Sequence, residues 1–501
     1  MPEALVIGSG FAGLSAATSL AGLGFRVRVL EKNDRFGGRA RVLRDQGFTF
    51  DMGPSWYWMP EVFEDYFLRN GSSVEQHYDL IRLDPSYKVI FGHEDQWDIP
   101  ADMRDLEALF ASIEPGADRA LRRFLNEARV KYELGMNELV RRPALSWTEF
   151  MLPRVLGGML KVSVFSSLRK HVAAHFKDPR LRQLMEFPVL FLGATPQNTP
   201  ALYSLMNYAD MSLGTWYPMG GMGRIVDAMV ELAKGKGVHL DAGMNVEQIL
   251  VRDGRAAGVV ANGERIDADV VISAADYHHA ETLLEPRHRS YSESYWSSRT
   301  MAPSSLLFYL GFDRKLPELA HHDLFFDQAF DQHAKEIYET PQWPTAPLIY
   351  ASCTSRTDPS VAPPGHENVV VLIPVAPGLE DTPVIRDKYF RMAIERLNKH
   401  TGKELREHLV VHHSYCINDF VQDYNSYAGN AYGLANTLGQ TAVLKPRMKS
   451  KKVKGLYFTG QLTAPGPGVP PTLISGQVVA ELIAKEHGRT QRNSMLNAAM
   501  V

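Results

Sequence analysis

Residues 4–31 read ALVIGSGFAGLSAATSLAGLGFRVRVLE, and this stretch decides the fold. It opens with an apolar run typical of a buried strand and continues with three glycines spaced G-x-G-x-x-G. An Ala- and Leu-rich helical segment follows, and a second apolar run ends at Glu31. The order strand, tight turn, helix, strand predicts a doubly wound α/β unit of the dinucleotide-binding type.

Each glycine in this stretch has a separate physical role. Gly8 permits the tight turn out of the strand, Gly10 lets a pyrophosphate approach the backbone, and Gly13 lets the helix pack closely on the strand. The start of the helix supplies unpaired N–H groups and a positive dipole end for phosphates. The alternative is an ordinary strand–turn–helix with three incidental glycines. The predicted phosphate-binding residues are Gly8, Gly10, Phe11, Ala12 and Gly13.

The residues after the second strand extend the predicted site. Glu31 can accept hydrogen bonds from both hydroxyl groups of an adenosine ribose, and Lys32 follows it. Gly37-Gly38 would let a second backbone segment cross close to the pyrophosphate, and Arg39 can neutralise its charge. The next stretch, 47–55, alternates in polarity and closes on Gly53-Pro54-Ser55.

This arrangement resembles the flavin amine oxidase and phytoene desaturase superfamily, whose members bind FAD. The resemblance implies that Gly53, Pro54 and Ser55 also belong to the cofactor site. NAD is the alternative cofactor, and the Gly-Gly-Arg element disfavours it. A second G-x-G-x-x-G for NADPH is absent from the sequence, so we expect electrons to enter from an organic substrate.

Length and composition limit the remaining possibilities. A chain of 501 residues predicts two or three domains, and 54 basic against 57 acidic residues give no field that would attract nucleic acid. Cys353 and Cys416 are the only cysteines, which argues against a dithiol reductase and a disulfide-stapled secreted protein. No apolar run approaches the roughly 20 residues of a membrane span, and the fingerprint begins too early to leave room for a signal peptide. We therefore expect a cytoplasmic or peripheral protein.

The same kind of pattern returns twice along the chain. Residues 220–224, GGMGR, open a helical segment, and short strands follow from residue 238 to 275. In the superfamily this chain resembles, Val246 would provide a backbone contact to the adenine. Residues 455–461 form an apolar strand followed by a loop rich in glycine and proline and a helix from 472 to about 486. That loop is expected to lie along the ribityl chain and the flavin, through Gly460, Gly468 and Val469, although a surface turn is the alternative.

The two later groups of strands and glycine-rich loops predict a discontinuous Rossmann-like FAD-binding domain with an inserted α+β substrate domain. This is the architecture of amine oxidases and GDI-like proteins. The FAD-binding domain is expected to comprise 1–87, 218–284 and 450–488. The substrate domain is expected to comprise 88–217 and 285–449, and 489–501 is expected to be a flexible tail.

Three motifs together narrow the resemblance. Residues 51–56 (DMGPSW), 217–222 (YPMGGM) and 459–470 (TGQLTAPGPGVP) look like those of bacterial-type phytoene desaturases, over nearly the whole chain. The resemblance implies FAD-dependent desaturation of phytoene, to lycopene in the usual case. The closing loop departs from the pattern, because many relatives carry His before the Pro-Gly where this chain reads QLTAP.

The sequence identifies no catalytic residue. Removing hydride from an allylic C–H builds a cation that the polyene itself stabilises, so the protein must mainly align the bond and exclude water. The proton acceptor could be a carboxylate, water or the flavin. Tyr208 and Asp210 lie near the Gly-Gly-Met element, where a helix cap or core hydroxyl is the more economical interpretation. The paired histidines make poor chelates, so no metal site is predicted.

A forty-carbon hydrocarbon barely dissolves in water, so we expect the enzyme to meet it at a membrane surface. Residues 150–168, FMLPRVLGGMLKVSVFSSL, are apolar with basic flanks and could lie in the headgroup region or line a substrate tunnel. Three alternatives to phytoene desaturation stay open: a later carotenoid desaturase, a carotenoid isomerase, and an isoprenoid carrier of GDI-like fold without redox chemistry. An amine oxidase is disfavoured because the C-terminal loop has no aromatic cage.

Overall fold

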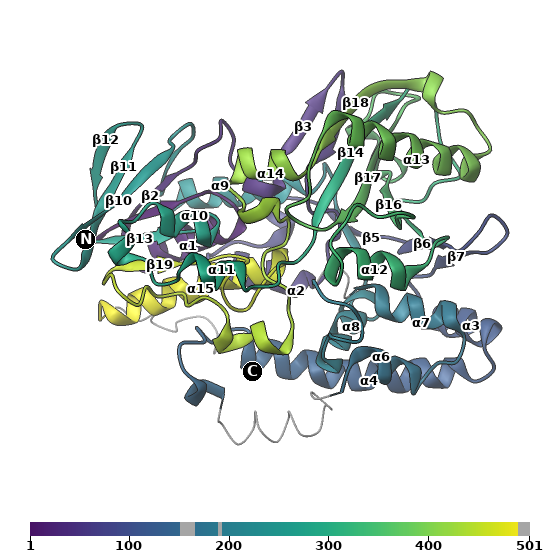
Figure 1. Ribbon diagram of the computed structural model, residues 1–501, viewed down its shortest axis with the longest axis horizontal. Helices are drawn as coiled ribbons and strands as arrows, with labels where there is room; N and C mark the ends of the chain where they lie inside the picture. Colours follow the sequence, from purple (N-terminus) through teal and green to yellow (C-terminus); the bar gives the residue numbers. More distant parts are fainter. Residues whose placement is uncertain (151–165, 189–192, 489–501) are drawn as a thin grey trace.

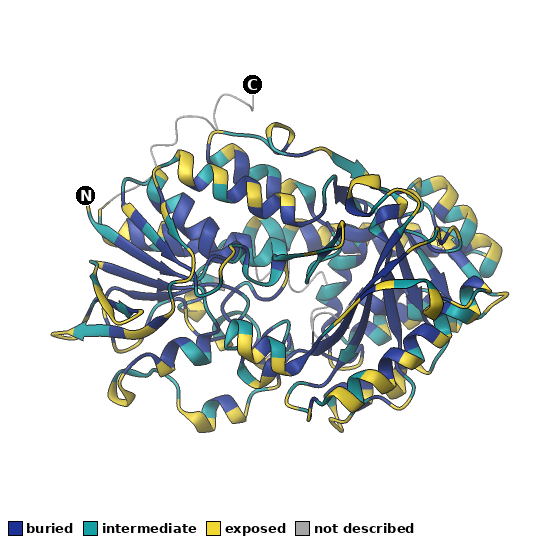
Figure 2. Ribbon diagram, turned by 90° about the horizontal axis from the view of Figure 1, so that it is seen from above, coloured by how far each residue is buried: buried dark blue, intermediate teal, exposed yellow. Residues whose placement is uncertain are grey.

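The computed structural model describes residues 1–150, 166–188 and 193–488. The predicted flexible tail 489–501 and most of the apolar segment 150–168 lie outside the described residues. Figure 1 shows two sheets side by side, with a group of helices below the second. Strands of both sheets are buried, whereas outer helices carry the exposed side chains (Figure 2).

The first sheet is parallel and has the strand order β19-β13-β1-β2-β9. Its central strand is the first of the chain, and its edge strand β19 is the last strand before the final helix. The strands fall within the three segments expected for the cofactor-binding half, although the domain boundaries themselves stay a prediction. The bounds are β1 (Glu3–Ile7), β2 (Arg26–Leu30), β9 (His239–Asp241), β13 (Val270–Ser273) and β19 (Leu456–Phe458).

Each face of this sheet is covered by a different layer. Helices α1 (Phe11–Gly22), α9 (Gly223–Gly235) and α15 (Val469–Glu486) pack on one face through small and branched residues. The other face packs against a three-stranded antiparallel sheet and helix α10. That layer comprises β10 (Val246–Arg252), β11 (Arg255–Ala261), β12 (Glu264–Asp267) and α10 (Tyr277–Thr282).

Helices α1 and α15 cross without a gap because a glycine lies at the crossing. A Cβ on Gly476 would lie 2.4 Å from the carbonyl oxygen of Ala12 and 2.7 Å from Cβ of Ser15. The Ser15 hydroxyl donates to the carbonyl of Leu473 (2.7 Å), which fixes the crossing further. The contact joins the first helix of the chain to the last.

The second sheet has seven strands in the order β18-β14-β17-β16-β15-β6-β7. Its long central pair, β14 and β17, alternates between two cores: Phe308 packs toward helix α13, whereas Tyr309 packs toward the cofactor half. The bounds are β6 (Tyr87–Ile90), β7 (Gln96–Ile99), β14 (Ser304–Phe312), β15 (His322–Phe325), β16 (Ile349–Ser352), β17 (Glu367–Val375), β18 (Leu409–Tyr415) and α13 (Pro383–Thr401).

Helices close the molecule below the second sheet (Figure 1). The longest is α4 (Ala117–Leu134), which packs against α3 and α8 through Leu121 and Phe124. The other helices are α2 (Pro60–Arg69), α3 (Met103–Ile113), α6 (Leu168–Ala173), α7 (Pro179–Glu186), α8 (Leu205–Met211), α11 (Glu293–Ser297), α12 (Phe330–Tyr338) and α14 (Ile417–Tyr424). Two ribbons, β3 (Val42–Asp45) with β4 (Phe48–Asp51) and β5 (Leu80–Arg82) with β8 (Trp216–Pro218), connect the halves. The α/β fold with an inserted mixed sheet is thereby confirmed.

Asp210 is a structural group in the helical layer. Its side chain is 1% exposed and accepts hydrogen bonds from the hydroxyl groups of Tyr87 (2.7 Å) and Thr215 (3.2 Å). These bonds tie α8 to β6 and to the segment before β8. Burial raises the pKa of Asp210 to about 7.

The raised pKa predicts a pH-dependent stability term. The folded protein keeps a proton on Asp210 up to about pH 7, whereas the unfolded chain releases it near the ordinary value of 3.8. The stabilisation that comes from the protonated Asp210 side chain is therefore full at low pH and is lost as the pH rises toward 7. We expect the free energy of unfolding of Asp210→Asn, relative to the wild type, to increase with pH between 4 and 7 by up to about 1.4 kcal/mol per pH unit. Urea unfolding at several pH values checks this, and a pH-independent difference would contradict it.

Candidate cofactor-binding site

The predicted glycine-rich loop joins the carboxyl end of β1 to α1. A Cβ on Gly13 would lie 2.0 Å from the carbonyl oxygen of Gly8, so only glycine allows the helix to begin this close to the strand. Gly8 has a positive φ of 94°, and a Cβ on Gly10 would meet no atom within 4 Å. Open space therefore adjoins Gly10 at the start of α1, where Phe11 and Ala12 contribute the first helical N–H groups.

Parallel pairing brings four predicted segments to one edge of the sheet. Strands β2, β1, β13 and β19 run in the same direction, so the residues after them share the carboxyl edge. These residues include Gly8, Glu31 and Gly460. Ligands of open α/β sheets bind at this edge, which makes it the candidate site.

Glu31 is held in place before any ligand binds. One carboxylate oxygen accepts from the N–H (2.9 Å) and hydroxyl (2.6 Å) of Ser9, and the other accepts from the N–H of Asn33 (2.9 Å). The side chain is 4% exposed, so these bonds fix its position at the glycine-rich loop. Asn33 Nδ2 also donates to this second oxygen (3.0 Å), so each oxygen already accepts two bonds and a ribose hydroxyl would replace one of these donors.

The Gly-Gly-Arg element crosses the glycine-rich loop. The N–H of Gly37 donates to the carbonyl of Ser9 (3.1 Å), and a Cβ on Gly38 would lie 3.2 Å from Cα of Gly10. Gly37 and Gly38 both have positive φ, at 111° and 54°. The second segment therefore lies directly on the first, with no room for side chains between them.

Arg39 supplies a buried positive charge beside this crossing. Its Nη2 donates to the hydroxyl of Ser426 (3.1 Å) and to the carbonyl of Asn430 (3.3 Å), and its guanidinium lies 5.0 Å from the ring centre of Tyr424. Its Nε is buried without a hydrogen-bond partner among the described residues. Burial lowers the pKa of Arg39, and the carboxylate of Asp276 opposes that shift.

The Asp-Met-Gly-Pro segment packs on the same crossing. A Cβ on Gly53 would lie 2.4 Å from the carbonyl oxygen of Arg39, so glycine is required there too. Asp51, two residues earlier, accepts from the N–H groups of Met222 (2.8 Å) and Gly223 (3.0 Å) and thereby caps α9. Burial raises the pKa of Asp51 to about 6. Pro54 and Ser55 follow Gly53 and stay partly accessible.

The loop between β19 and α15 also contacts the start of α1. A Cβ on Gly460 would lie 3.7 Å from Cβ of Ala12, and the Gly460 N–H donates to the hydroxyl of Ser475 on α15 (3.1 Å). Helix α15 then begins at Val469, with Gly468 as its N-cap at a φ of 107°. Of its first four residues only Val469 keeps an N–H for a ligand, because Pro470 and Pro471 have none and the Thr472 N–H donates to the carbonyl of Gly468 (3.0 Å).

Val246 and Lys32 lie at the margin of the site. Val246 opens β10 two residues after Met244, whose N–H donates to the carbonyl of Glu31 (2.8 Å). Lys32 points toward α14, where its Nζ donates to the carbonyl of Gln422 and contacts Asn425 Oδ1 (3.4 Å). The structure thus brings together the glycines, Glu31 and Arg39, and engages Lys32 with another segment.

The residues at this edge fit a dinucleotide. An accessible backbone turn at the start of α1, a guanidinium with a buried unpartnered N–H and a fixed carboxylate match phosphates and a ribose. Sequence reasoning missed Ser9, Ser426 and Asn430. Ser9 stands inside the glycine motif, and its pairing with Glu31 could have been expected from the hydroxyl. Ser426 and Asn430 carry no sequence signal, because they reach Arg39 from almost 390 positions away.

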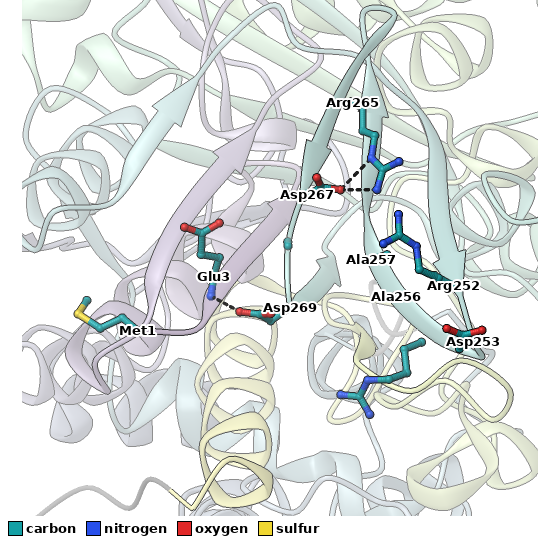
Figure 3. A pocket seen from close by; sticks show the side chains of 11 residues that line it. Met1, Glu3, Arg252, Asp253, Ala256, Ala257, Arg265, Asp267 and Asp269 are labelled. Carbon is teal, nitrogen blue, oxygen red and sulfur yellow. Dashed lines mark hydrogen bonds and ion pairs between the residues drawn. The ribbon is translucent and has the colours of Figure 1, made fainter.

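An open hollow elsewhere does not belong to this site. Figure 3 shows it beside the amino end of β1, where Arg265 pairs with Asp267 and the Glu3 N–H donates to Asp269. It is polar and lies at the opposite edge of the sheet from the glycine-rich loop. Within the described ranges, no cluster of three His, Cys, Asp or Glu side chains is arranged to hold a metal ion.

Comparisons with known proteins agree with this geometry. Residues 11–484 match the family described as flavin containing amine oxidoreductase. The chain is 41% identical over 488 residues to the carotenoid 3,4-desaturase of Haloarcula japonica, covering 97% of this chain and 98% of that protein. It is 33% identical over 485 residues to the zeta-carotene-forming phytoene desaturase of Myxococcus xanthus, covering 95% and 93%.

Solved structures share the fold at low sequence identity. An oxidoreductase of Methanosarcina mazei has a TM-score of 0.64 at 19% identity and covers 96% of this chain and 100% of that one. A Rab GDI of Plasmodium falciparum has a TM-score of 0.58 at 11% identity, covering 98% of each chain. At these identities the likeness concerns the fold alone.

Proposed function

The chain belongs to the flavin containing amine oxidoreductase family and is an FAD-dependent oxidoreductase of the carotenoid desaturase type, and from this premise we propose that it desaturates the 3,4 bond of a carotenoid. One observation carries the choice of bond: the 41% identity to a carotenoid 3,4-desaturase extends over 97% of this chain. Phytoene, the substrate expected from the sequence motifs, is the second candidate. It is supported by the 33% identity to a phytoene desaturase.

The cofactor supplies the chemistry that the side chains lack, because flavin accepts a hydride from a C–H bond. We assign binding of its pyrophosphate to the loop at Gly10 and to Arg39, and binding of its ribose to Glu31. The start of α15, at Gly468 and Val469, would face the flavin ring. Asp210 takes no part, since its carboxyl group is buried and engaged with Tyr87 and Thr215.

An apolar path for the substrate is supported by side chains that lie deep but stay accessible. Burial raises the pKa of Tyr203 and of Tyr432 to about 12, although both side chains are only partly buried. Partly buried apolar residues that pack against the same large core include Met52, Trp56, Met206, Ala431 and Val469. A path of this composition would align a hydrocarbon and exclude water.

The test uses FAD-loaded protein and liposomes that contain either lycopene or phytoene. Lycopene has saturated 3,4 bonds next to its polyene, so we expect its absorption bands to move to longer wavelength and its mass to fall by two hydrogens per new double bond. Phytoene is expected to stay colourless. Visible bands from phytoene alone would favour the second candidate, and no change with either substrate would overturn the proposal.

We further propose that the protein binds a membrane surface to collect its substrate. In the described parts of the chain, no helix combines the length and the apolar character that a bilayer crossing needs. Trp147 is 62% exposed and lies just before the apolar segment 151–165, which is outside the described residues, and Leu444 is 41% exposed. An exposed tryptophan just before such a segment in the chain favours insertion at the headgroup level.

Trp147→Ser should weaken binding to vesicles several-fold, because it removes an aromatic ring that can lie in the interface. Val384→Ser is the matched control: Val384 is 78% exposed on α13, and its loss should leave binding unchanged. Vesicle flotation measures both variants. Equal flotation of Trp147→Ser and wild type would contradict this placement of the membrane surface.

A further inference from the structure

Lys445 is a buried cation whose charged group has no polar partner among the described residues. It follows the short helical turn Ala442–Leu444 and its side chain is only 3% exposed. Its Nζ has no hydrogen-bond partner among the described residues, and none of their ion pairs includes it. An ammonium group without a partner is costly to bury, so such a site indicates a ligand that completes it. Burial lowers the pKa of Lys445 to about 7.

A second unpartnered polar atom lies at the same point. Asn436 is 4% exposed, and its Oδ1 has no hydrogen-bond partner in the described part of the chain. A Cβ added to Gly466 would lie 3.3 Å from Asn436 Oδ1 and 3.5 Å from Lys445 Nζ. A hydrogen-bond donor and an acceptor therefore converge at one glycine, and the acceptor comes from a different segment than the donor.

The position of Gly466 connects this pair to the cofactor site. Gly466 lies two residues before Gly468, the N-cap of α15. The segment that carries Asn436 begins at Asn430, whose carbonyl accepts from Arg39 (3.3 Å). Between them, a Cβ on Gly433 would lie 3.1 Å from the carbonyl oxygen of Gln461. The segment 430–436 thus runs from the proposed pyrophosphate position along the loop before α15.

The chemistry of the pair matches one edge of the flavin ring. The pyrimidine edge of an isoalloxazine presents carbonyl oxygens on both sides of an N–H group. We propose that Lys445 donates to a pyrimidine carbonyl, that Asn436 Oδ1 accepts from the ring N–H, and that the lysine charge stabilises the negative charge that reduction brings to this edge. A hydrocarbon substrate offers neither atom a partner. The inference rests on the cofactor placement proposed above.

The experiment measures flavin binding and the flavin midpoint potential without any carotenoid, so a failed desaturation assay does not affect it. Lys445→Met keeps the length of the side chain and removes its charge, and Lys445→Arg keeps the charge. Lys454→Met is the control, because Lys454 is an exposed lysine of the same basic stretch. Apoprotein is titrated with FAD, and the bound FAD is then reduced in a potentiometric titration.

We expect Lys445→Met to weaken binding of reduced FAD at least tenfold more than binding of oxidised FAD, which lowers the two-electron midpoint potential by about 30 mV. Lys445→Arg and Lys454→Met should stay close to the wild type. Asn436→Ala, which removes only the acceptor, should weaken binding of oxidised FAD about tenfold. Because Lys445→Met removes an unpaired buried charge, the apoprotein should unfold at a higher temperature than the wild type.

Three results would overturn the proposal. One is an unchanged midpoint potential in FAD-loaded Lys445→Met. Another is unchanged FAD affinity in Asn436→Ala. This second variant still tests the proposed flavin contact if Lys445→Met does not fold. A change in Lys454→Met equal to that in Lys445→Met would likewise overturn it, because the effect would then reflect surface charge.

Discussion

Gly476→Ala is expected to destabilise the apoprotein by about 3 kcal/mol or more, because the added methyl group has no space at the crossing of two helices. The added Cβ would lie 2.4 Å from the Ala12 carbonyl oxygen and 2.8 Å from the Ala16 backbone nitrogen. Both are backbone atoms of α1, which cannot rotate away as a side chain could. Helix α15 would have to move off α1 and would take the Ser475 contact to Gly460 with it.

Gly22→Ala is the control for this substitution. Gly22 lies in α1 as well, and the nearest atom to its added Cβ would be the flexible Lys236 Nζ at 3.9 Å. We expect its stability to stay within about 1 kcal/mol of the wild type and to rise if it changes, since alanine favours helix. Urea unfolding followed by circular dichroism compares the two variants. Equal stabilities would show that the helix crossing tolerates a methyl group.

Arg39→Met is expected to weaken FAD binding about 10- to 100-fold. The guanidinium lies beside the Gly37-Gly38 crossing, and its Nε is buried without a hydrogen-bond partner among the described residues. Charge-assisted hydrogen bonds of this kind contribute about 1.5–3 kcal/mol each. Fluorescence titration of the apoprotein with FAD measures the loss.

The local structure should survive this change. The hydroxyl of Ser426 already donates to the carbonyl of Asn430, so the segment that holds Arg39 has its own internal bond. Arg35→Met is the matched control, because Arg35 is exposed in the same loop. If Arg39→Met binds FAD as tightly as Arg35→Met, the pyrophosphate does not lie at Arg39.

Much of the cofactor half could be predicted from the sequence because its determinants are local. Gly8, Gly10 and Gly13 stand within six positions of each other. Gly8 has a positive φ and Gly13 has no space for a Cβ, whereas Gly10 adjoins open space. The strand after Gly455 and the helix after Gly468 were likewise readable from apolar patterning and turn residues. The cofactor and the enzyme class predicted from these motifs are confirmed by the family match. The exact carotenoid stays a proposal.

Contacts between distant segments could not be predicted. Within residues 445–454, KPRMKSKKVK, Lys445 is buried, whereas Lys451, Lys452 and Lys454 are exposed. No property of the stretch distinguishes them, since burial depends on where Gly466 and Asn436 lie in space. The pairing of strands in the seven-stranded sheet could not be predicted from the sequence either, because the strands come from segments separated by more than 200 residues.

The pairing of β19 with β13 also sets the order of events during synthesis. The first strand leaves the ribosome almost at once, but the sheet around it cannot be completed until residues 456–458 have been translated. In the interval, β1 and β2 form an unfinished apolar surface with open edges, the kind of nascent chain that chaperones shield. With the cofactor placed at this edge as proposed, we expect FAD to load late, onto an essentially finished polypeptide. We expect chains that end before this strand to lose FAD binding.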